Sequence, residues 1–352
     1  MRMGYAPYSP DLSPPADRRR FPFYARQRGI DFEIANPESA YDIVVVTPRA
    51  DLRAWSSYRP GRARVVFDMV DSYLAIARWD PKAILRGPAK FLAGEARHPF
   101  HSYRRSIERM LQRADATTCA TPEQAAAISP LCPNVHPILD FQSEVVAQVK
   151  GDYRAGSPFH LVWEGLATNV RWFGEVGPAL TEVDRRHPLV LHLITTLEYR
   201  EFVQRYWRRQ TSRIAARHFE NVRLHQWSED RVSVVATACD AAVIPLPLDH
   251  PFVSGKPENK LIGFWRMGLP TVTSSTPAYT RAMTEAGQDL ACATHDDWID
   301  RLLRLIDDEE ARRVAGQTGR ALAEQRYGDD RLLEAWDGVF ESLTARSRSQ
   351  PA

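Results

Sequence analysis

Lysine and small polar residues gather in one loop of the second half of the sequence. Between two apolar segments of PLPLDHPFVSGKPENKLIGFWRMGLPTV, residues 245–272, stand Ser254, Gly255, Lys256, Asn259 and Lys260. Apolar residues at helical spacing follow and Gly268 ends the pattern, so the loop leads into a helix start. Free N–H groups and the positive end of the helix dipole favour an anion there, such as a pyrophosphate. The alternative is a solvated loop with unrelated charges.

Two acids and three arginines in the first half could also do chemistry. In RVVFDMVDSYL, Asp68 and Asp71 stand where a candidate strand ends. They could orient a hydroxyl, and one could act as a base. The alternative is a capping pair for the following helix. Arg18, Arg19 and Arg20 follow the loop after the first strand, and we expect them either to bind an anionic acceptor or to form a solvated face.

Several classes of site are missing from the sequence. The ten histidines have no H-E-x-x-H or C-x-x-C partners, and no D-x-D motif is present, so we expect no metal site. The chain has no G-x-G-x-x-G after its first strand and no G-x-x-x-x-G-K-[ST] loop. These absences argue against a nicotinamide dehydrogenase and a P-loop ATPase, and we expect no cofactor.

Composition points to a protein without a strong overall charge. The chain has 352 residues and a formal net charge of +2, which predicts no global attraction to nucleic acid. Its four cysteines lie far apart, and its start lacks the apolar core of a signal peptide, so we expect a cytoplasmic protein. Residues 73–113 hold nine basic and three acidic residues interleaved with aromatics. Such a surface suits peripheral contact with an anionic membrane, while solvated helices are the alternative.

Strand and helix patterns alternate along both halves. Short runs rich in Val and Ile are separated by longer helical patterns, which is typical of βα units and mostly parallel sheets. The expected strands are MRMGYA, IDFEIA, YDIVVVT, RVVFDMV, ATTCA, FHLVWEG, LVLHLIT, VRLHQW, DAAVIPL and the short TVTSS. The expected helices include residues 16–28, most of 73–113, 170–187, 199–218 and 229–238.

Residues 143–158 have the Gly, Pro and charge content of a linker. We therefore expect an α/β protein of two Rossmann-like domains, residues 1–150 and 151–330, facing each other across a cleft. Residues 331–352 are expected to form a C-terminal helix, which could pack back on the first domain, and a disordered tail. In such open sheets a ligand binds beyond the carboxyl ends of the strands.

Three segments resemble GT-B glycosyltransferases, in particular the retaining group that includes sucrose synthases. DAAVIPLPLDHPFVSGKPENKLIGFWRMGLPTVTSSTPAYTRAM is similar to their donor-binding region, and FHLVWEGLATNVRWF to the first strand, turn and helix of their C-terminal domain. DDWIDRLLRLIDDEEARRVAGQTGRALAEQRY is similar to their closing helices. The likeness covers most of the chain from residue 159 onward. In the first half only the order of elements and RADATTCATPEQ match.

The resemblance implies roles for particular residues. Lys256, Lys260 and Arg171 would hold the diphosphate of a nucleoside diphosphate sugar, and Trp227 would stack on the base. Gly165 belongs to the donor-side turn, which it shapes together with Trp163 and Glu164. The family usually carries two Glu eight positions apart, where this chain has Gly255 and Gly263. Glu258 could replace one of them from within the loop.

The implied activity is transfer of a sugar to a hydroxyl of a glycan, lipid-linked intermediate or natural product. The resemblance implies retention of the anomeric configuration without a metal ion. Asp71, and Asp68 beside it, would position the reacting hydroxyl, while Arg171 and Lys256 would stabilise the leaving diphosphate. Two alternatives remain: an inactive nucleotide-sugar-binding or regulatory subunit, and a nucleotide-sugar epimerase.

Overall fold

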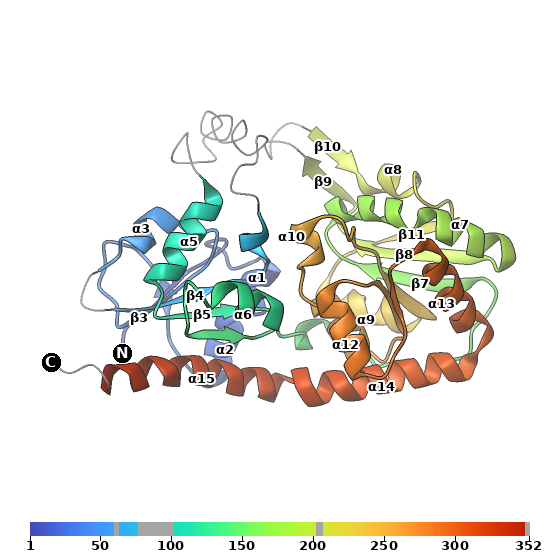
Figure 1. The fold of residues 1–352 in the computed structure, drawn as a ribbon. Helices are drawn as coiled ribbons and strands as arrows, with labels where there is room; N and C mark the ends of the chain where they lie inside the picture. Colours follow the sequence, from blue (N-terminus) through green and yellow to red (C-terminus); the bar gives the residue numbers. More distant parts are fainter. Residues whose placement is uncertain (60–62, 77–101, 202–206, 349–352) are drawn as a thin grey trace. The chain divides into compact units, whose positions relative to one another are not determined.

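The computed structural model describes residues 1–59, 63–76, 102–201 and 207–348. The chain forms two compact units, which are labelled by element in Figure 1. Unit 1 comprises Met1–Phe141 and Asp329–Ala352, and unit 2 comprises Gln142–Gly328. No helix among the described residues combines the length and apolarity needed to cross a membrane.

Unit 1 is built on a parallel sheet of six strands, in the order β2-β1-β3-β4-β5-β6. The strands are β1 (Met3–Ala6), β2 (Glu33–Ile34), β3 (Ile43–Val46), β4 (Arg64–Asp68), β5 (Ala116–Cys119) and β6 (Val135–Pro137). β1, β3 and β5 are buried along their whole length, which matches their continuous runs of apolar and small residues. The chain runs from β1 to β2 on one side and then to β3 on the other, so the strand order reverses beside β1.

Most helices among the described residues of unit 1 have eight residues or fewer. The helices are α1 (Pro15–Arg18), α2 (Phe21–Arg28), α3 (Leu52–Ser56), η2 (Tyr73–Ala75), α5 (Tyr103–Arg113), α6 (Pro122–Ile128) and α15 (Asp329–Arg348). The single helix expected over residues 16–28 is wrong: Arg20, with φ −130° and ψ −128°, interrupts it. Most of the basic stretch 73–113 falls on residues 77–101, which lie outside the described part of the chain.

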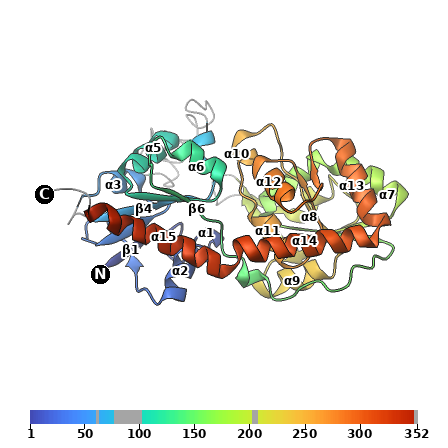
Figure 2. The same ribbon diagram turned by 60° about the horizontal axis from the view of Figure 1, so that its bottom comes forward.

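The C-terminal helix α15 belongs to unit 1. Its Trp336 ring stacks on Tyr24 of α2 at a centroid distance of 5.6 Å, and Phe340 stacks on the same ring at 5.4 Å. Asp337 of α15 forms an ion pair with Arg28 and accepts a hydrogen bond from the Tyr24 hydroxyl. Figure 2 shows α15 running beside α2. Aromatic stacking and an ion pair therefore hold α15 against α2.

Unit 2 has a second parallel six-stranded sheet, in the order β11-β8-β7-β12-β13-β14. Its strands are β7 (Phe159–Glu164), β8 (Leu189–Thr195), β11 (Val222–Gln226), β12 (Ala241–Ile244), β13 (Thr271–Ser274) and β14 (Ala291–Cys292). The α/β class with two parallel sheets, expected from the sequence, is confirmed. The chain moves outward from β7 to β8 and β11, then returns to β12 on the other side of β7. This reversal makes the β7–β12 junction the topological switch point, where open α/β sheets bind ligands.

The connections of unit 2 are mainly helical. They are η3 (Ser143–Val145), η4 (Ala167–Glu175), α7 (Gly177–Arg186), α8 (Thr211–Ala215), α9 (Glu229–Thr237), α10 (Pro251–Ser254), α11 (Asn259–Arg266), α12 (Pro277–Glu285), α13 (His295–Asp307) and α14 (Glu309–Tyr327). The helix expected after the lysine loop is confirmed as α11, and Gly268 follows it with φ +75°, a value that favours glycine. The helix expected over 170–187 is divided between η4 and α7, with Pro178 in the first turn of α7.

The helix expected over residues 199–218 is wrong. The antiparallel strands β9 (Glu198–Glu201) and β10 (Trp207–Gln210) occupy its first part, and only the short helix α8 follows. Tyr199 in β9 and Trp207 in β10 are aromatic residues, a type that favours strands. Local β preference therefore outweighed the apparent helical spacing.

Buried cations hold the segment that follows residue 142 to the rest of unit 2. The Lys150 ammonium donates to the carbonyl oxygens of Thr237 at 3.3 Å and Cys239 at 2.8 Å. Arg312 of α14 donates to the carbonyl oxygen of Tyr153 at 2.7 Å, and the Tyr153 hydroxyl donates to the carbonyl oxygen of Gly268 at 2.9 Å. Residues 150–153, expected in a linker, are thus anchored to α9, α14 and the turn after α11.

Candidate functional site

Two loops meet the switch point of unit 2. One begins at Glu164, the last residue of β7, and contains Gly165. The other follows β12 and runs through α10 to the start of α11. Several of the residues singled out from the sequence stand on these two loops, and their contacts show which of them come together.

Lys260 and Gly165 lie in direct contact. Lys260 is the second residue of α11, and its ammonium donates to the carbonyl oxygen of Glu164 at 2.8 Å. The same nitrogen lies 3.9 Å from Glu164 Oε2 and 5.2 Å from the centroid of the Trp163 ring. A Cβ on Gly165 would lie 2.8 Å from the buried Trp163 ring and would displace the Lys260 ammonium, so glycine favours the close approach of the two loops. The positive charge is therefore placed at the end of the central strand.

Trp227 reaches the same point from β11. Its indole Nε1 donates to Glu164 Oε1 at 2.9 Å, and its main-chain N–H donates to the carbonyl oxygen of Thr195 at 3.0 Å. The Glu164 carboxylate therefore holds the indole ring, and the Thr195 carbonyl oxygen holds the Trp227 main chain, at the carboxyl ends of neighbouring strands. A flat, partly exposed ring in this position is suited to stacking on a planar ligand.

Glu164 is the residue whose importance the sequence did not reveal. It was expected only to shape a turn, yet it contacts Trp227 with one carboxylate oxygen and Lys260 with its carbonyl oxygen. Its side chain is 21% exposed, so the carboxylate is partly desolvated. An acid as the last residue of a central parallel strand is the only signal in the sequence that could have identified it.

Lys256 and Arg171 belong to the two loops but not to this cluster of contacts. The Lys256 ammonium lies 5.7 Å from the Trp172 ring centroid of η4 and 5.8 Å from that of Phe252 in α10. Arg171 precedes Trp172 in η4 and is exposed. The lysine loop and η4 are thus in contact, with two cations on the same pair of elements. Ser254 and Gly255 form the end of α10, where the Ser254 hydroxyl donates to the carbonyl oxygen of Pro251 at 3.3 Å.

Glu258 faces another part of unit 2. It is 1% exposed, and its carboxylate forms an ion pair with Arg281 of α12 at 2.9 Å. Burial and then Glu258 raise the pKa of Tyr327, at the end of α14, to about 12. These contacts favour a structural role for Glu258, which joins the start of α11 to α12 and α14. They argue against the contact with the ribose that the sequence suggested for Glu258. Asn259 begins α11 and is half-buried, and Gly263 faces Gln142.

In unit 1, Arg20 and Asp68 form a buried ion pair. Arg20 Nε donates to Asp68 Oδ1 at 2.7 Å, and its Nη1 donates to Asp140 Oδ1 at 3.0 Å. The side chains of Arg20 and Asp68 have no exposed surface. Burial lowers the pKa of Arg20, but Asp68 and Asp140 raise it more, so the guanidinium stays charged. Of the expected acceptor and catalytic residues, Arg20 and Asp68 are therefore better explained as a structural pair that ties α2 to β4.

Asp71, Arg18 and Arg19 keep partial exposure. Asp71 follows β4, and its carbonyl oxygen accepts from the N–H of Tyr73 at 2.8 Å. The Tyr73 hydroxyl lies 3.2 Å from that of Tyr8, which follows β1, so aromatic hydroxyls line the carboxyl edge of this sheet near Asp71. Arg18 ends α1, and Arg19 caps it.

No three His, Cys, Asp or Glu side chains within the described ranges are grouped so that they could hold a metal ion. The proposed absence of a metal stays a prediction. The four cysteines are separate and buried.

Comparisons with known proteins give the fold. No protein-family model matches the chain, and no curated protein matches it. The structure of HepE from Anabaena, in complex with UDP and glucose, superposes with a TM-score of 0.63 at 11% identity over 98% of this chain and 99% of that one. Sucrose-phosphate synthase from Thermosynechococcus elongatus gives a TM-score of 0.61 at 11% identity, over 93% and 77%.

A third structure, that of TarM, gives a TM-score of 0.59 at 12% identity. It is matched over 85% of this chain and 54% of its own length, so the chain spans about half of TarM. At these identities the likeness concerns architecture alone. These structures have the GT-B fold, and the GT-B fold expected from the sequence is confirmed.

Proposed function

We propose that this protein is a glycosyltransferase that moves a sugar from a nucleoside diphosphate sugar to a hydroxyl acceptor. The observation that carries the proposal is the contact of Lys260, Gly165 and Trp227 with the end of β7, at the switch point of a GT-B unit. An ammonium and an aromatic ring held at such a point suit a diphosphate and a base. The HepE structure, which contains UDP and glucose, supports a nucleotide sugar as the donor.

In the proposed mechanism, Lys260, Lys256 and Arg171 bind the diphosphate, and Trp227 stacks on the base. As the bond from the sugar to the diphosphate breaks, negative charge grows on the leaving group. Cations fixed beforehand stabilise that charge more than they stabilise the bound donor, and this difference lowers the barrier. Asp71 would position the acceptor hydroxyl, and Arg18 and Arg19 are the remaining candidates for contact with an anionic acceptor.

Three finer features belong to the proposal by resemblance. They are retention of the anomeric configuration, independence from a metal ion, and a hexose or related sugar as the group transferred. Contact of residues 73–113 with a membrane surface and a cytoplasmic location also stay predictions. The acceptor class is open among a glycan, a lipid-linked intermediate and a natural product.

A second candidate is a nucleotide-sugar-binding subunit without catalysis. Gly255 and Gly263 stand where the related enzymes usually carry glutamates, and the carboxylate of Glu258 holds Arg281. Slow release of free sugar from the donor separates the two candidates. A transferase leaks hydrolysed donor, whereas a binding subunit leaves the donor intact.

The lysines provide the direct test. We expect Lys256→Ala combined with Lys260→Ala to weaken UDP binding at least about 100-fold, because each ammonium–phosphate contact contributes about 1.5–3 kcal/mol. Isothermal titration with UDP, GDP, dTDP, ADP and CMP measures this effect and also identifies the base. Arg320→Ala, on the exposed side of α14, is the control and should bind nucleotide normally. Unchanged nucleotide affinity in the folded double variant would remove the basis of the proposal.

A further inference from the structure

A group of polar residues lies at the carboxyl edge of the unit 1 sheet. The strand order reverses beside β1, so the ends of β1 and β3 form the topological switch point of this sheet, where open α/β sheets bind ligands. Tyr8 follows β1, Arg49 follows β3, and Asp71 and Tyr73 follow β4. These four residues therefore come to one edge from three neighbouring strands, and only Asp71 was expected there from the sequence.

Three tyrosines link the loops at this edge. The Tyr8 hydroxyl lies 3.2 Å from that of Tyr73, and the rings of Tyr73 and Tyr103 meet edge to face with their centroids 5.9 Å apart. The Tyr103 hydroxyl donates to the carbonyl oxygen of Pro48 at 2.9 Å, which holds α5 to the loop after β3. The loops after β1, β3 and β4 are therefore joined through one cluster of aromatic side chains.

A buried carboxylate fixes the loop after β1. Asp17 has no exposed surface, and its oxygens accept from the main-chain N–H groups of Tyr8 at 2.9 Å and Ser9 at 3.0 Å. The same carboxylate accepts from the Tyr5 hydroxyl at 2.6 Å. The main chain at Tyr8 therefore has a defined position before any ligand binds, which lowers the entropic cost of binding.

Arg49 and Asp71 place opposite charges beside the same two tyrosine rings. Burial raises the pKa of Tyr73, the charge of Asp71 raises it further, and the charge of Arg49 lowers it. Burial also raises the pKa of Tyr103, while Arg49 lowers it and Asp71 raises it. Arg49 is exposed, and no hydrogen bond or ion pair joins its side chain to another residue that the structure describes. The edge therefore presents one guanidinium to an anion.

Two buried oxygens at this edge, Thr47 Oγ1 and Asp68 Oδ2, have no hydrogen-bond partner among the described residues. Both side chains are fully buried. Val46 of β3 pairs with Phe67 of β4, so the residues that follow them, Thr47 and Asp68, are neighbours. Burial and Tyr73 raise the pKa of Tyr8, and the charge of Asp68 adds to this effect, so Asp68 lies near Tyr8. A donor that reaches these oxygens, such as a ligand hydroxyl or a bound water, would remove the cost of leaving them unpaired.

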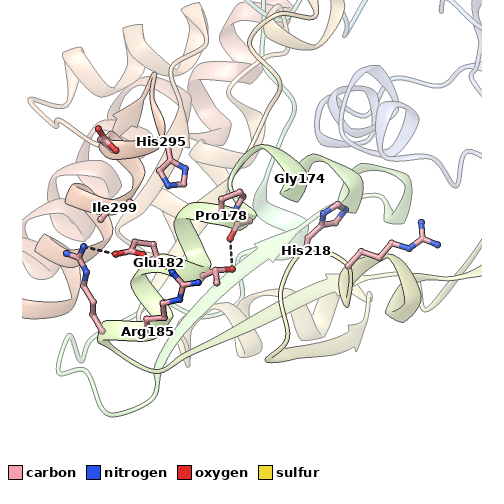
Figure 3. A pocket seen from close by; sticks show the side chains of 12 residues that line it. Gly174, Pro178, Glu182, Arg185, His218, His295 and Ile299 are labelled. Atoms are coloured by element: carbon pink, nitrogen blue, oxygen red, sulfur yellow. Dashed lines mark hydrogen bonds and ion pairs between the residues drawn. The ribbon is translucent and has the colours of Figure 1, made fainter.

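The pocket of unit 2 in Figure 3 has a different arrangement. Arg185 and Arg186 of α7 are exposed, and they pair with Glu182 of the same helix at 3.2 Å and 2.8 Å. The charges of these arginines are therefore balanced in part within one helix, whereas Arg49 has no such partner among the described residues.

We propose that the carboxyl edge of unit 1 binds the acceptor of the transferase as a sugar that carries a carboxylate, such as a uronic acid residue. Arg49 forms a two-pronged ion pair with that carboxylate, and the hydroxyls of Tyr8 and Tyr73 bind hydroxyls of the sugar. Asp71 accepts from the reacting hydroxyl. One guanidinium near one carboxylate suits a single negative charge better than the double charge of a phosphate. This assignment rests on the proposed function and narrows its acceptor to an acidic sugar.

Matched pairs of sugars test the role of the charge. Methyl glucuronide and methyl galacturonide differ from methyl glucoside and methyl galactoside only at C6, where a carboxylate replaces a hydroxymethyl group. In isothermal titration without a donor, we expect an acidic sugar to bind at least about fivefold more tightly than its neutral counterpart, as a well-formed ion pair at a partly exposed site allows. Arg49→Gln should bring this ratio to one or below, because Asp71 remains. Arg26→Gln, at an exposed position of α2, is the matched control and should keep the ratio.

Tyr73→Phe tests the hydroxyl pair separately. The variant keeps the ring and should weaken the acidic and the neutral sugar by the same factor, about fivefold, because one hydrogen bond between neutral groups is lost. Thermal melting checks that each variant is folded. Equal binding of acidic and neutral sugars, a preference that survives Arg49→Gln, or no binding of any of the four sugars would overturn the assignment.

Titration with UDP separates this assignment from the proposed function. Arg49→Gln should leave the UDP affinity unchanged, since the proposed donor residues all belong to unit 2. If UDP does not bind but the acidic sugar binds and depends on Arg49, the transferase proposal fails and the edge is still a site for an acidic sugar. If UDP binds and the sugars show no preference, only the acceptor assignment fails.

Discussion

At the scale of single residues, the candidate site depends on how Glu164 divides its contacts. One carboxylate oxygen accepts from the Trp227 indole, while the other lies 3.9 Å from the Lys260 ammonium. The first contact orients a ring for stacking, and the second places a negative charge where a diphosphate is proposed to bind. The Glu164 carboxylate therefore orients the Trp227 ring and would also repel the diphosphate of the proposed ligand.

We predict that Glu164→Ala weakens UDP binding about five- to tenfold, because loss of the acceptor frees the Trp227 ring, an effect of about 1 kcal/mol. Glu164→Gln should restore the affinity or exceed it, since an amide oxygen still accepts the hydrogen bond and the negative charge is gone. Isothermal titration with UDP compares the three proteins, and thermal melting checks that they are folded. If glutamine is as damaging as alanine, the carboxylate charge and not the orientation of Trp227 is what matters.

At the scale of elements, three neighbouring strands of unit 2 are linked by a row of histidines. His160 Nδ1 on β7 lies 2.9 Å from His192 Nε2 on β8, and His192 Nδ1 lies 2.9 Å from His225 Nε2 on β11. The rings of His192 and His225 are nearly parallel, at an interplanar angle of 9°. Burial, then His225 and His160, lower the pKa of His192 to about 4. The row is thus stable only while its central ring is neutral.

This row predicts acid sensitivity. The unfolded chain binds a proton at His192 near pH 6.5, whereas the folded chain does so only near pH 4. The stability from this residue is therefore present above pH 6.5 and is lost as the pH falls from there toward 4. From pH 7 to pH 5 we expect the free energy of unfolding to fall by about 2 kcal/mol because of His192. His192→Gln, which keeps a donor and an acceptor, should show a smaller loss in denaturant titrations at the two pH values. An equal loss in both proteins would assign the acid sensitivity to other groups.

At the scale of the whole molecule, the last helix completes the first unit. α15 packs on α2, where the Trp336 ring is fully buried and the Arg20 guanidinium lies 5.8 Å from its centroid. The same arginine forms the buried ion pairs with Asp68 and Asp140, so α15 also covers the polar centre of unit 1. Residues from both ends of the chain therefore form the core of unit 1.

Trp336→Ala should lower the unfolding free energy of unit 1 by about 3–5 kcal/mol, because it leaves a large cavity beside a buried charge. Scanning calorimetry measures the change. Arg331→Ala, at an exposed position of the same helix, should alter stability by no more than about 0.5 kcal/mol. Similar losses in the two variants would mean that α15 is not closely packed against unit 1.

Much of the architecture could be predicted because its signals are local. Apolar runs mark β7 and β12, and the spacing of Leu261, Ile262 and Trp265 with Gly268 marks α11 and its end. Over residues 199–218 the helical spacing predicted a helix, while the residues that favour strands indicated the strands β9 and β10 that form there. The charges of the lysine loop were visible in the sequence, but their neighbours were not.

The sequence by itself determined the two βα series, the helix after the lysine loop and the residues that reach the strand ends, since each depends on neighbours a few positions away. Three features depend on the tertiary structure. They are the hydrogen bond of Trp227 to Glu164, the buried ion pair of Arg20 with Asp68, and the row of three histidines. Those partners are 63, 48 and about 30 residues apart. Whether a charged side chain meets ligand or another charge depends on burial, and burial is set when distant segments pack.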